Sequence, residues 1–538
     1  MKGEFNPDKQ GCYSSRIRVK QGNRLLENKI LTAEKISVLT SFLGKSYPFK
    51  ELDKAWKKIL FYQFHDSICG TIVDSAYKEV LQGHRETEKI LNKVLSENLN
   101  FLANRIKGSE KRTLIFNPLP WERKDLVEIE GKGPQIITIP PLGYKRFSLT
   151  SKKIPNTFKI KDNQIENKFY KIRLGENGLI SSLISKENNF EYVDRKRPFF
   201  NDLVIQDDNG DLWQYYEGPS VDSVGWGFAQ DNWKDPIPTK PKFSQSGKRQ
   251  IGFFRHSKDI KNKVEIIEKG PARVTIRVSG ELSFWKIKVK FIQHICLYSN
   301  LERIDFKTEI FPSGRHYRIR VAFPTSIKKR KIYHEIPFGN IQRPEGEFPA
   351  QNWLAYGDKK KGLLLLNQGL PGNNVTDRAM MLSLMRSVAM EYKGTSEKAF
   401  EEGIHHTFNY SLIPYNQKSF SFFTRKGLEF NNPFISRRLK PSEGKLAREA
   451  SFIRITPENV VLSALRKTED GIILRAYETE GKGCNGRIEF SKRLKLNIIE
   501  KTNFLGRAKE EKIRVKENTL EFFLFPYQIR NFKLEDKR

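Results

Sequence analysis

The stretch Leu52–Glu79, LDKAWKKILFYQFHDSICGTIVDSAYKE, places a short polar motif between two helical patterns. Before the motif, AWKKILFYQF spaces its apolar residues as an amphipathic helix does, and VDSAYKEVLQGHRETEKILNKVL does so again after it. Between them, Gln63–Thr71 reads QFHDSICGT, with an adjacent His65–Asp66 pair and a glycine, Gly70, that permits a tight turn. The stretch therefore predicts two helices joined by a turn that carries chemically active side chains.

Helical patterns cover about Asn23–Lys107. The upstream run NRLLENKILTAEKISVLTSFLG keeps its apolar residues near one face, and Gly44 followed by Pro48 marks its end. A further helix is predicted from about Ser75 to Arg105. Three helices with short connections indicate an antiparallel bundle.

After Gly108 the pattern changes to that of strands. Short β-branched runs such as TLIFNPLPW and QIITIPPLG are separated by Pro and Gly, and ARVTIRVSG places Val274, Ile276 and Val278 on one face. Similar runs continue in LLLLNQG, FNYSLIPY, GIILRAYE and LEFFLFPY, RAMMLSLMR fits either helix or strand, and no helix is as convincing as the first three. We therefore predict a mainly β chain with a helical N-terminal part, a three-helix bundle followed by several antiparallel β-sandwich domains.

The length and composition are those of a globular protein with several domains. The chain has 538 residues, too many for one core, of which 38% are hydrophobic and 12% aromatic. No run reaches the roughly 18 apolar residues of a membrane-spanning helix, and the N-terminal residues show no signal peptide. The four cysteines, Cys12, Cys69, Cys296 and Cys484, are scattered, which indicates a reducing compartment, the cytoplasm, rather than a disulfide framework.

The formal net charge of +33 suggests nucleic acid as a partner, because lysine and arginine neutralise phosphates. The basic residues are spread along the whole chain, however, and no helix-turn-helix, zinc-finger or RNP pattern accompanies them. A lysine-rich solvated surface is the favoured interpretation, and we expect neither a nucleic-acid nor a membrane partner.

The His65–Asp66 pair allows a functional and a structural interpretation. A neutral imidazole is a good zinc ligand, and a carboxylate can hold sugar hydroxyls or act as a base. Alternatively, the pair is a satisfied polar contact at a helix junction, where Thr71 or Asp74 caps the next helix. The residues alone leave both interpretations open.

A second candidate site is the acidic and aromatic stretch DDNGDLWQYY. It brings together Asp207, Asp208, Asp211, Trp213, Tyr215 and Tyr216. Aromatic rings beside carboxylates suit sugar binding, but a hairpin with an aromatic cluster at its edge explains the pattern equally well. The stretch lacks the spacing and the terminal glutamate of an EF-hand calcium loop.

His405 and His406 are adjacent in an apparent strand, so we expect one to be buried and bonded and the other exposed. Arg343 and Arg386 fit structural ion pairs.

Leu52–Glu79 resembles the helical-domain signature of glycoside hydrolase family 38, the retaining α-mannosidases, in which a Trp-containing helix leads into QFHD. GEFNPDKQGCYSSR is similar to the segment that links the family's catalytic barrel to its bundle, and LIFNPLPWER to the start of its β region. EIPFGNIQRP, PAQNWLAYGD, SLMRS and LRAYETEG resemble later landmarks in the expected order. The resemblance covers essentially the whole chain.

The resemblance implies a zinc-dependent glycosidase in which two carboxyl groups roughly 5 Å apart cleave the bond with retention. His65 matches the zinc ligand of QFHD, and Asp66 matches the adjoining aspartate that contacts the sugar. The stretch with Asp211, Trp213 and Tyr215 is our candidate for a sandwich loop that reaches over the active site. The implied domains are 1–22 as the tail of the catalytic domain, 23–108 as the bundle, 109–155 as a small β domain, 156–450 as the large sandwich and 451–538 as the C-terminal β domain.

The sequence departs from the family in one respect that matters for activity. None of its eight histidines is followed by aspartate two positions later, as the barrel's zinc-binding His-x-Asp pair requires. We therefore expect no catalytic residue on this chain and an incomplete zinc site, because one imidazole holds the metal poorly. The expected partners are a mannoside or oligosaccharide and a second chain that carries the barrel, unless the barrel has been lost.

Three functions are open at this point: part of an α-mannosidase, a non-catalytic carbohydrate-binding sandwich protein, and a basic scaffold for acidic polymers. The first predicts that a partner chain restores hydrolysis, and the second that mannosides bind without any partner. The third predicts binding that weakens steeply with salt. A bundle made to pack on a barrel should also expose apolar surface without it.

Overall fold

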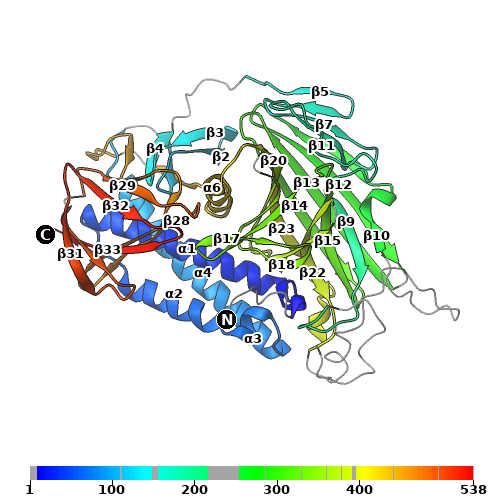
Figure 1. Ribbon diagram of the computed structural model, residues 1–538, viewed down its shortest axis with the longest axis horizontal. Helices are drawn as coiled ribbons and strands as arrows, with labels where there is room; N and C mark the ends of the chain where they lie inside the picture. The colour runs from blue at the N-terminus through cyan, green and yellow to red at the C-terminus, as the bar shows by residue number, and fades with distance from the viewer. Residues whose placement is uncertain are drawn as a thin grey trace.

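The computed structural model describes residues 9–108, 112–147, 155–215, 254–284, 286–328, 330–358, 360–376, 378–390, 396–439, 442–494 and 496–536. Figure 1 shows three regions: the long N-terminal helices across the lower left, the C-terminal strands beyond them at the left, and a large β-sandwich at the right. The predicted fold class, mainly β with a helical N-terminal part, is confirmed.

The helical part consists of three long helices and a short one. They are α1 (Ile17–Phe42), α2 (Phe49–Tyr62), α3 (His65–Cys69) and α4 (Asp74–Ala103), preceded by the 3₁₀ helix η1 (Gln10–Tyr13). The three long helices form the predicted bundle, but α1 begins at Ile17, earlier than the predicted Asn23. The motif between α2 and α4 forms a helical turn of its own, α3, instead of a plain loop.

The large sandwich consists of two antiparallel sheets. The six-stranded sheet has the order β10 (Phe254–His256), β9 (Asp202–Asp207), β15 (Tyr317–Pro324), β22 (Ala379–Ser387), β21 (Gly372–Thr376), β18 (Gly346–Pro349). The nine-stranded sheet has the order β11 (Lys263–Lys269), β12 (Arg273–Phe284), β13 (Ile287–Tyr298), β14 (Ile304–Ser313), β23 (His406–Asn416), β20 (Lys361–Asn367), β19 (Trp353–Gly357), β16 (Lys331–Ile336), β17 (Gly339–Arg343). The run RAMMLSLMR, which fitted helix or strand, is strand β22 with its neighbouring residues.

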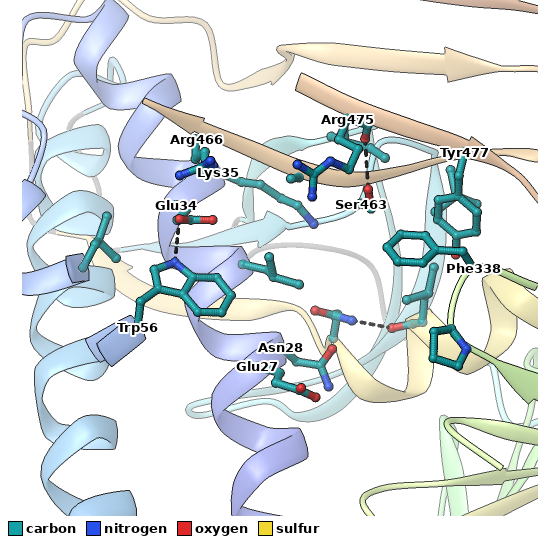
Figure 2. A pocket seen from close by; sticks show the side chains of 18 of the residues that line it. Glu27, Asn28, Glu34, Lys35, Trp56, Phe338, Ser463, Arg466, Arg475 and Tyr477 are labelled. Carbon is teal, nitrogen blue, oxygen red and sulfur yellow. Dashed lines mark hydrogen bonds between the residues drawn. The ribbon is translucent and has the colours of Figure 1, made fainter. Parts of the chain in front are cut away.

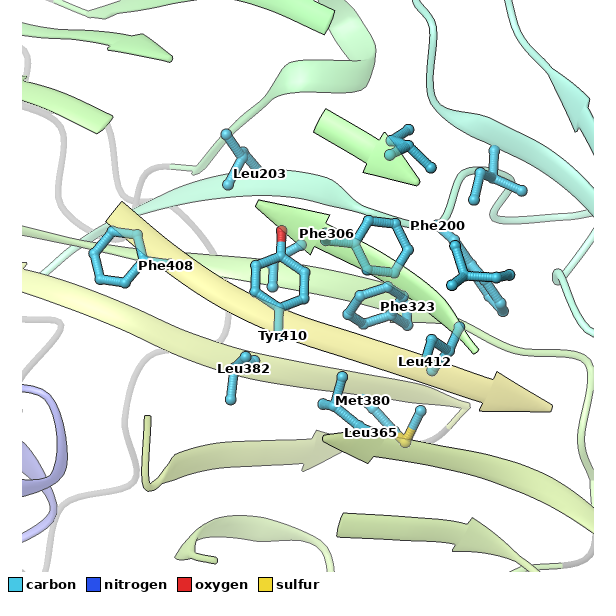
Figure 3. Close-up of a cluster of buried hydrophobic side chains, with 14 of the residues drawn as sticks. Phe200, Leu203, Phe306, Phe323, Leu365, Met380, Leu382, Phe408, Tyr410 and Leu412 are labelled. Atoms are coloured by element: carbon cyan, nitrogen blue, oxygen red, sulfur yellow. The ribbon is translucent and has the colours of Figure 1, made fainter. Parts of the chain in front are cut away.

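Aromatic side chains fill the space between these two sheets (Figure 3). The rings of Phe306 and Tyr410 stack with centroids 5.3 Å apart, and Phe323 meets Phe306 edge-on at 5.7 Å. The Tyr410 hydroxyl is satisfied inside the core, because it lies 2.7 Å from Thr308 Oγ1 and 2.7 Å from Asn201 Oδ1. Each fully buried phenyl ring contributes about 1.5–3 kcal/mol to stability, so this core accounts for much of the sandwich's rigidity.

Smaller sheets complete the β region. One has the order β24 (Ile435–Leu439), β1 (Arg112–Asn117), β4 (Gly143–Phe147), β25 (Glu449–Ser451), beside the hairpin β2 (Arg123–Ile129) and β3 (Gly133–Ile139). Another contains β5 (Lys159–Lys161), β6 (Gln164–Glu166), β7 (Tyr170–Leu174) and β8 (Ile180–Ser185). The pairing of β24 and β25 with β1 and β4 crosses the predicted boundaries at 155 and 450.

The C-terminal β domain is itself a sandwich. Its sheets have the orders β26 (Ile453–Thr456), β29 (Cys484–Phe490), β32 (Thr519–Leu524) and β27 (Val460–Thr468), β28 (Gly471–Glu478), β33 (Ile529–Asp536), β30 (Leu496–Thr502), β31 (Ala508–Arg514). Its core is continuous with that of the helical bundle, since Leu26 and Ile36 of α1 belong to the same apolar cluster as Leu474 and Phe532. Bundle and C-terminal domain therefore support each other.

One helix in the β region was not predicted. Helix α6 (Phe420–Asn431) packs on β19 and β20, and its Phe423 meets Trp353 edge-on at 5.4 Å. Ser419 caps it by accepting a hydrogen bond from the Phe422 amide. A serine followed by apolar residues at Phe420 and Phe423 is a helix-start signal that could have revealed it.

Candidate functional site

His65 and Asp66 lie at the start of α3 and face outward. Helix α2 ends at Tyr62, and Phe64 adopts φ −49° and ψ 137°, which turns the chain before α3 begins at His65. The side chain of His65 is 78% exposed and that of Asp66 is 48% exposed, with Nε2 and Oδ1 3.6 Å apart. The pair is therefore an accessible imidazole and carboxylate side by side, and neither is buried in the bundle.

Buried contacts hold the far end of α3 in place. Gly70 has φ 78°, and a Cβ there would lie 2.9 Å from the Ser15 carbonyl oxygen and 2.9 Å from Lys20 Nζ. The Lys20 ammonium donates to the carbonyls of Ser15 at 2.5 Å and Cys69 at 2.6 Å, and burial lowers its pKa to about 8. The exposed His65–Asp66 pair thus stands on a rigid base.

Neither Thr71 nor Asp74, which the sequence suggested as caps of the next helix, caps α4. Val73 is the N-cap of α4 and provides no side-chain hydrogen bond. Thr71 Oγ1 donates back to the Asp66 carbonyl at 3.4 Å, and Asp74 Oδ1 pairs with the buried Arg16 guanidinium at 2.8 Å. Both residues therefore tie the motif to its surroundings.

Two cysteines meet beneath the motif. The thiol of Cys12, in η1, interacts with that of Cys69, at the end of α3. This contact with Cys12, together with the positive charge of Lys20, lowers the pKa of Cys69 below its ordinary value. The same contact and burial raise the pKa of Cys12. Cys69 should therefore be the reactive thiol of the pair.

We expect iodoacetamide at neutral pH to label Cys69 before the other three cysteines, because the thiolate is the reactive form. Burial raises the pKa of Cys296 to about 11 and also raises that of Cys484, so these two serve as internal controls. Peptide mapping by mass spectrometry after short labelling times measures the order. Equal labelling of Cys69 and Cys484 at pH 7 would contradict this assignment.

The acidic and aromatic stretch follows β9 and wraps around one buried arginine. Arg386 of β22 donates from Nε to Asp208 Oδ2 at 2.6 Å and from Nη2 to Asp208 Oδ1 at 3.0 Å. It also donates to the carbonyls of Asp211 at 2.8 Å and Gln214 at 2.6 Å, and to Ser15 Oγ at 2.9 Å. Arg386 is thus a structural ion-pair residue, as the sequence suggested, and it fixes the shape of the stretch.

The predicted sugar-binding residues of this stretch have structural contacts of their own. Asp211 is buried, and its Oδ1 accepts from the amides of Trp213 and Gln214, both at 2.8 Å. Trp213 is half-buried against Leu212 and Val388, and the ring of Tyr215 lies 3.3 Å from the Arg318 guanidinium carbon. Asp207 is buried beside Asn209 Nδ2 at 2.7 Å. Tyr216 lies outside the described residues.

The N-terminal segment joins this stretch to α3. Ser15 Oγ donates to the Leu212 carbonyl at 2.8 Å, and Cys12 Sγ points to the Trp213 carbonyl at 3.9 Å while it also contacts Cys69. The structure therefore brings the two candidate stretches onto one small anchor. No local pattern in the sequence predicted this anchor, because its residues lie far apart in the chain.

The remaining candidate residues are structural. His406 is buried, with Nε2 3.0 Å from Glu401 Oε2, whereas His405 is exposed and contacts Glu309 at 3.2 Å, as predicted. Arg343 donates to the Pro349 carbonyl at 2.6 Å.

The described part of the chain does not form a metal centre by itself. Among the residues described, no group of three or more His, Cys, Asp or Glu side chains is placed to hold a metal ion. His65 and Asp66 therefore do not suffice for zinc, which in proteins takes four ligands. None of the described helices is both long and apolar enough to cross a membrane.

Three family models match successive parts of the chain. The model of the alpha mannosidase middle domain matches residues 9–102, that of the glycosyl hydrolases family 38 C-terminal domain matches 165–391, and that of the family 38 C-terminal beta sandwich domain matches 459–532. The His65–Asp66 motif lies inside the middle-domain match.

Similar proteins point the same way. Alpha-mannosidase G of Dictyostelium discoideum is 23% identical over 97% of this chain and 52% of its own length, and human Alpha-mannosidase 2C1 is 23% identical over 96% of this chain and 49% of its own. The chain thus spans about half the length of these curated relatives. The crystal structure of an alpha-mannosidase from Enterococcus faecalis shares the fold, with a TM-score of 0.81 and 15% identity over 98% of this chain and 68% of its own.

Proposed function

Because this chain belongs to glycosyl hydrolase family 38, we propose that it is the helical and β-sandwich portion of an α-mannosidase that releases terminal α-linked mannose. The observation that carries the proposal is the exposed His65–Asp66 pair on a rigid base inside the middle-domain match. In this proposal the nucleophile and the acid/base come from a family 38 catalytic barrel, and the portion described here is inactive without it. The alternative is a non-catalytic carbohydrate-binding protein.

In this proposal Asp66 and His65 have different tasks. The Asp66 carboxylate accepts hydrogen bonds from mannose hydroxyls. These bonds are strong and directional because the acceptor is charged. His65 provides one zinc ligand, and the barrel has to provide the others, because the described residues form no zinc site of their own. The stretch that contains Asp211, Trp213 and Tyr215 would approach the sugar from the sandwich side, since it shares its anchor with α3. Its aromatic residues would face the sugar, while the buried Asp211 holds the shape of the stretch.

Exposed apolar side chains surround the motif and suit a docking partner. Leu60 is 58% exposed, Phe61 68% and Phe64 54%, and all three lie at the end of α2 or just before His65. Phenyl rings are costly to leave in water, and grouped ones mark interaction surfaces. A barrel that covers this patch would close the space in front of His65 and Asp66.

We expect the double variant Phe61→Ser and Phe64→Ser to bind much less of an apolar-surface dye such as ANS than the unmodified chain. The two rings are more than half exposed and stand just ahead of His65, so their loss removes apolar surface to which the dye can bind. The matched control is Phe504→Ser with Leu505→Ser, two exposed apolar residues at a turn between β30 and β31. Unchanged dye fluorescence in the first variant would contradict a patch at this position.

The proposed function is tested with protein isolated from its natural source. That material should release mannose from an aryl α-mannoside and leave the matching α-glucoside intact. The alternative, non-catalytic binding, predicts that the chain alone binds methyl α-mannoside in a calorimetric titration while no preparation hydrolyses it. If α-mannosides were neither hydrolysed nor bound, both proposals would be overturned.

The four cysteines are unpaired, and on that ground we propose the cytoplasm as the location of the protein.

A further inference from the structure

A pocket of about 820 Å³ lies between the helices and the C-terminal β domain (Figure 2). One face of α1 lines it through positions three or four residues apart, from Arg24 to Lys35, and one face of α2 does so from Phe49 to Leu60, with Gln63 just beyond its end. The opposite side consists of β27, β28, the turn at Phe338 and part of α6. Its volume is in the range of pockets that hold an organic ligand.

Three cations at this pocket have no carboxylate partner. Lys35 is 4% exposed, and its ammonium makes no hydrogen bond or ion pair within the described part of the chain. Figure 2 shows its side chain extended into the pocket below Arg475. Arg466 likewise has no hydrogen bond or ion pair among the described residues, and Arg475 donates only from Nε to Asn531 Oδ1 at 3.1 Å there. A buried cation without a counter-ion is costly, so a ligand anion would be strongly favoured.

A single carboxylate stands close to these cations and does not neutralise them. Glu34 Oε1 accepts from Trp56 Nε1 at 2.8 Å, while Oε2 is buried and has no hydrogen-bond partner among the residues described. Burial raises the pKa of Glu34 to about 7 against the opposing effects of Trp56 and the three cations, so it is only partly ionised at neutral pH. One partly charged acid facing three cations leaves an excess of positive charge.

Four other acids line the pocket. One of them, Glu469, is exposed at the turn between β27 and β28. Glu27 accepts from Arg24 at 2.7 Å and from Gln63 at 2.7 Å. Burial raises the pKa of Glu335 to about 7, and its Oε2 accepts from the Asn352 amide at 2.7 Å. Asp53 pairs with Lys57 at 2.8 Å. None of these carboxylates pairs with Lys35, Arg466 or Arg475 in the described structure.

We propose that this pocket binds a sugar that carries a phosphate or carboxylate group, with the anion held by Lys35, Arg466 and Arg475. Guanidinium groups match phosphate and carboxylate oxygens in pairs, and the ammonium adds a point charge. The open Oε2 of Glu34 needs a donor, which a ring hydroxyl provides. Trp56, Phe338 and Tyr477 offer flat apolar surface for the ring. Binding at this site needs no hydrolysis, and Lys35, Arg466 and Arg475 lie outside the apolar patch beside His65.

Calorimetric titration of the 538-residue chain at pH 7 and low salt tests the site. The probes are mannose 6-phosphate, glucuronate, mannose and inorganic phosphate. We expect saturable binding of the two acidic sugars. The Kd for mannose should be at least about tenfold higher than that for mannose 6-phosphate. Lys35→Met should raise the Kd for mannose 6-phosphate by at least about tenfold, because it removes the most deeply buried cation of the pocket. Arg466→Met should also raise this Kd.

The matched control is Lys29→Met, which removes a cation from the same helix outside the pocket, where Lys29 pairs with Glu88 at 2.6 Å. Lys35→Met removes an unpaired buried charge and keeps the side-chain length, so its thermal midpoint without ligand should not fall. Failure of both acidic sugars to bind saturably, or equal binding by Lys35→Met, would overturn the site. Equal affinity for mannose would overturn the anion assignment, and equal affinity for inorganic phosphate would overturn the sugar assignment. All these outcomes are read without any hydrolysis.

Discussion

Replacing Arg386 with methionine is expected to lower the free energy of unfolding by about 3–5 kcal/mol, the usual loss when one partner of a buried ion pair is removed. Arg386 is 2% exposed and Asp208 0%, so the carboxylate would remain buried without its cation. The change also removes three further hydrogen bonds. Those to the Asp211 and Gln214 carbonyls hold the stretch after β9, and that to Ser15 joins the sandwich to the N-terminal segment. Urea unfolding followed by circular dichroism measures this loss of unfolding free energy.

Two controls separate burial from charge. Arg315→Met removes a half-exposed arginine that pairs with Glu397 at 2.9 Å and Glu402 at 3.1 Å, and should cost less than about 1 kcal/mol. Asp208→Asn added to Arg386→Met removes the stranded charge and should recover part of the loss. A loss in Arg386→Met no larger than that in Arg315→Met would show that the anchor is not where the structure places it.

Replacing His65 with alanine in the active assembly is expected to lower kcat/KM by at least about 100-fold, because losing a ligand should exceed the 10–100-fold typical of outer-shell changes. Zinc content should fall with it. Asp66→Asn should lower kcat/KM by about 10–150-fold, the value of one charge-assisted hydrogen bond, and leave zinc content unchanged. Assays with an aryl α-mannoside and metal analysis of the same samples measure both.

The contrast between the two variants is the informative part. His405→Ala is the control for His65, since His405 is also exposed and contacts a carboxylate, Glu309, at 3.2 Å. It should leave kcat/KM and zinc content unchanged. If His65→Ala kept full zinc content and activity, the pair would be a surface contact at a helix junction, which is the structural interpretation of the motif.

Local periodicity was enough to predict the three long N-terminal helices and the strands assigned from alternating apolar residues. The spacing of Leu52, Ile59 and Tyr62 identified α2, and the alternation of Val274, Ile276 and Val278 identified β12, because both patterns reflect one buried face. Helix α6 was missed because it is short and lies among strands, where Ser419 was its clearest signal.

The anchor beneath the candidate site could not be predicted, because it depends on residues far apart in the chain. Ser15, Asp208 and Arg386 meet only after the six-stranded sheet forms, and no local pattern links them. The pocket at Lys35 is hidden in the sequence for the same reason, since Arg466 and Arg475 approach α1 from the C-terminal domain. The exposed position of His65, in contrast, agrees with a motif at a helix end.

The most direct test of the central claim is the composition of the active species from the natural source. The protein is isolated under mild conditions, and each polypeptide in the fraction that cleaves α-mannosides is identified by mass. The account predicts that these 538 residues occur there in stoichiometric amount with a family 38 catalytic barrel that carries His-x-Asp, together with zinc. Recovery of the chain by itself, without zinc and without α-mannosidase activity, would contradict an enzyme assembled around His65 and Asp66.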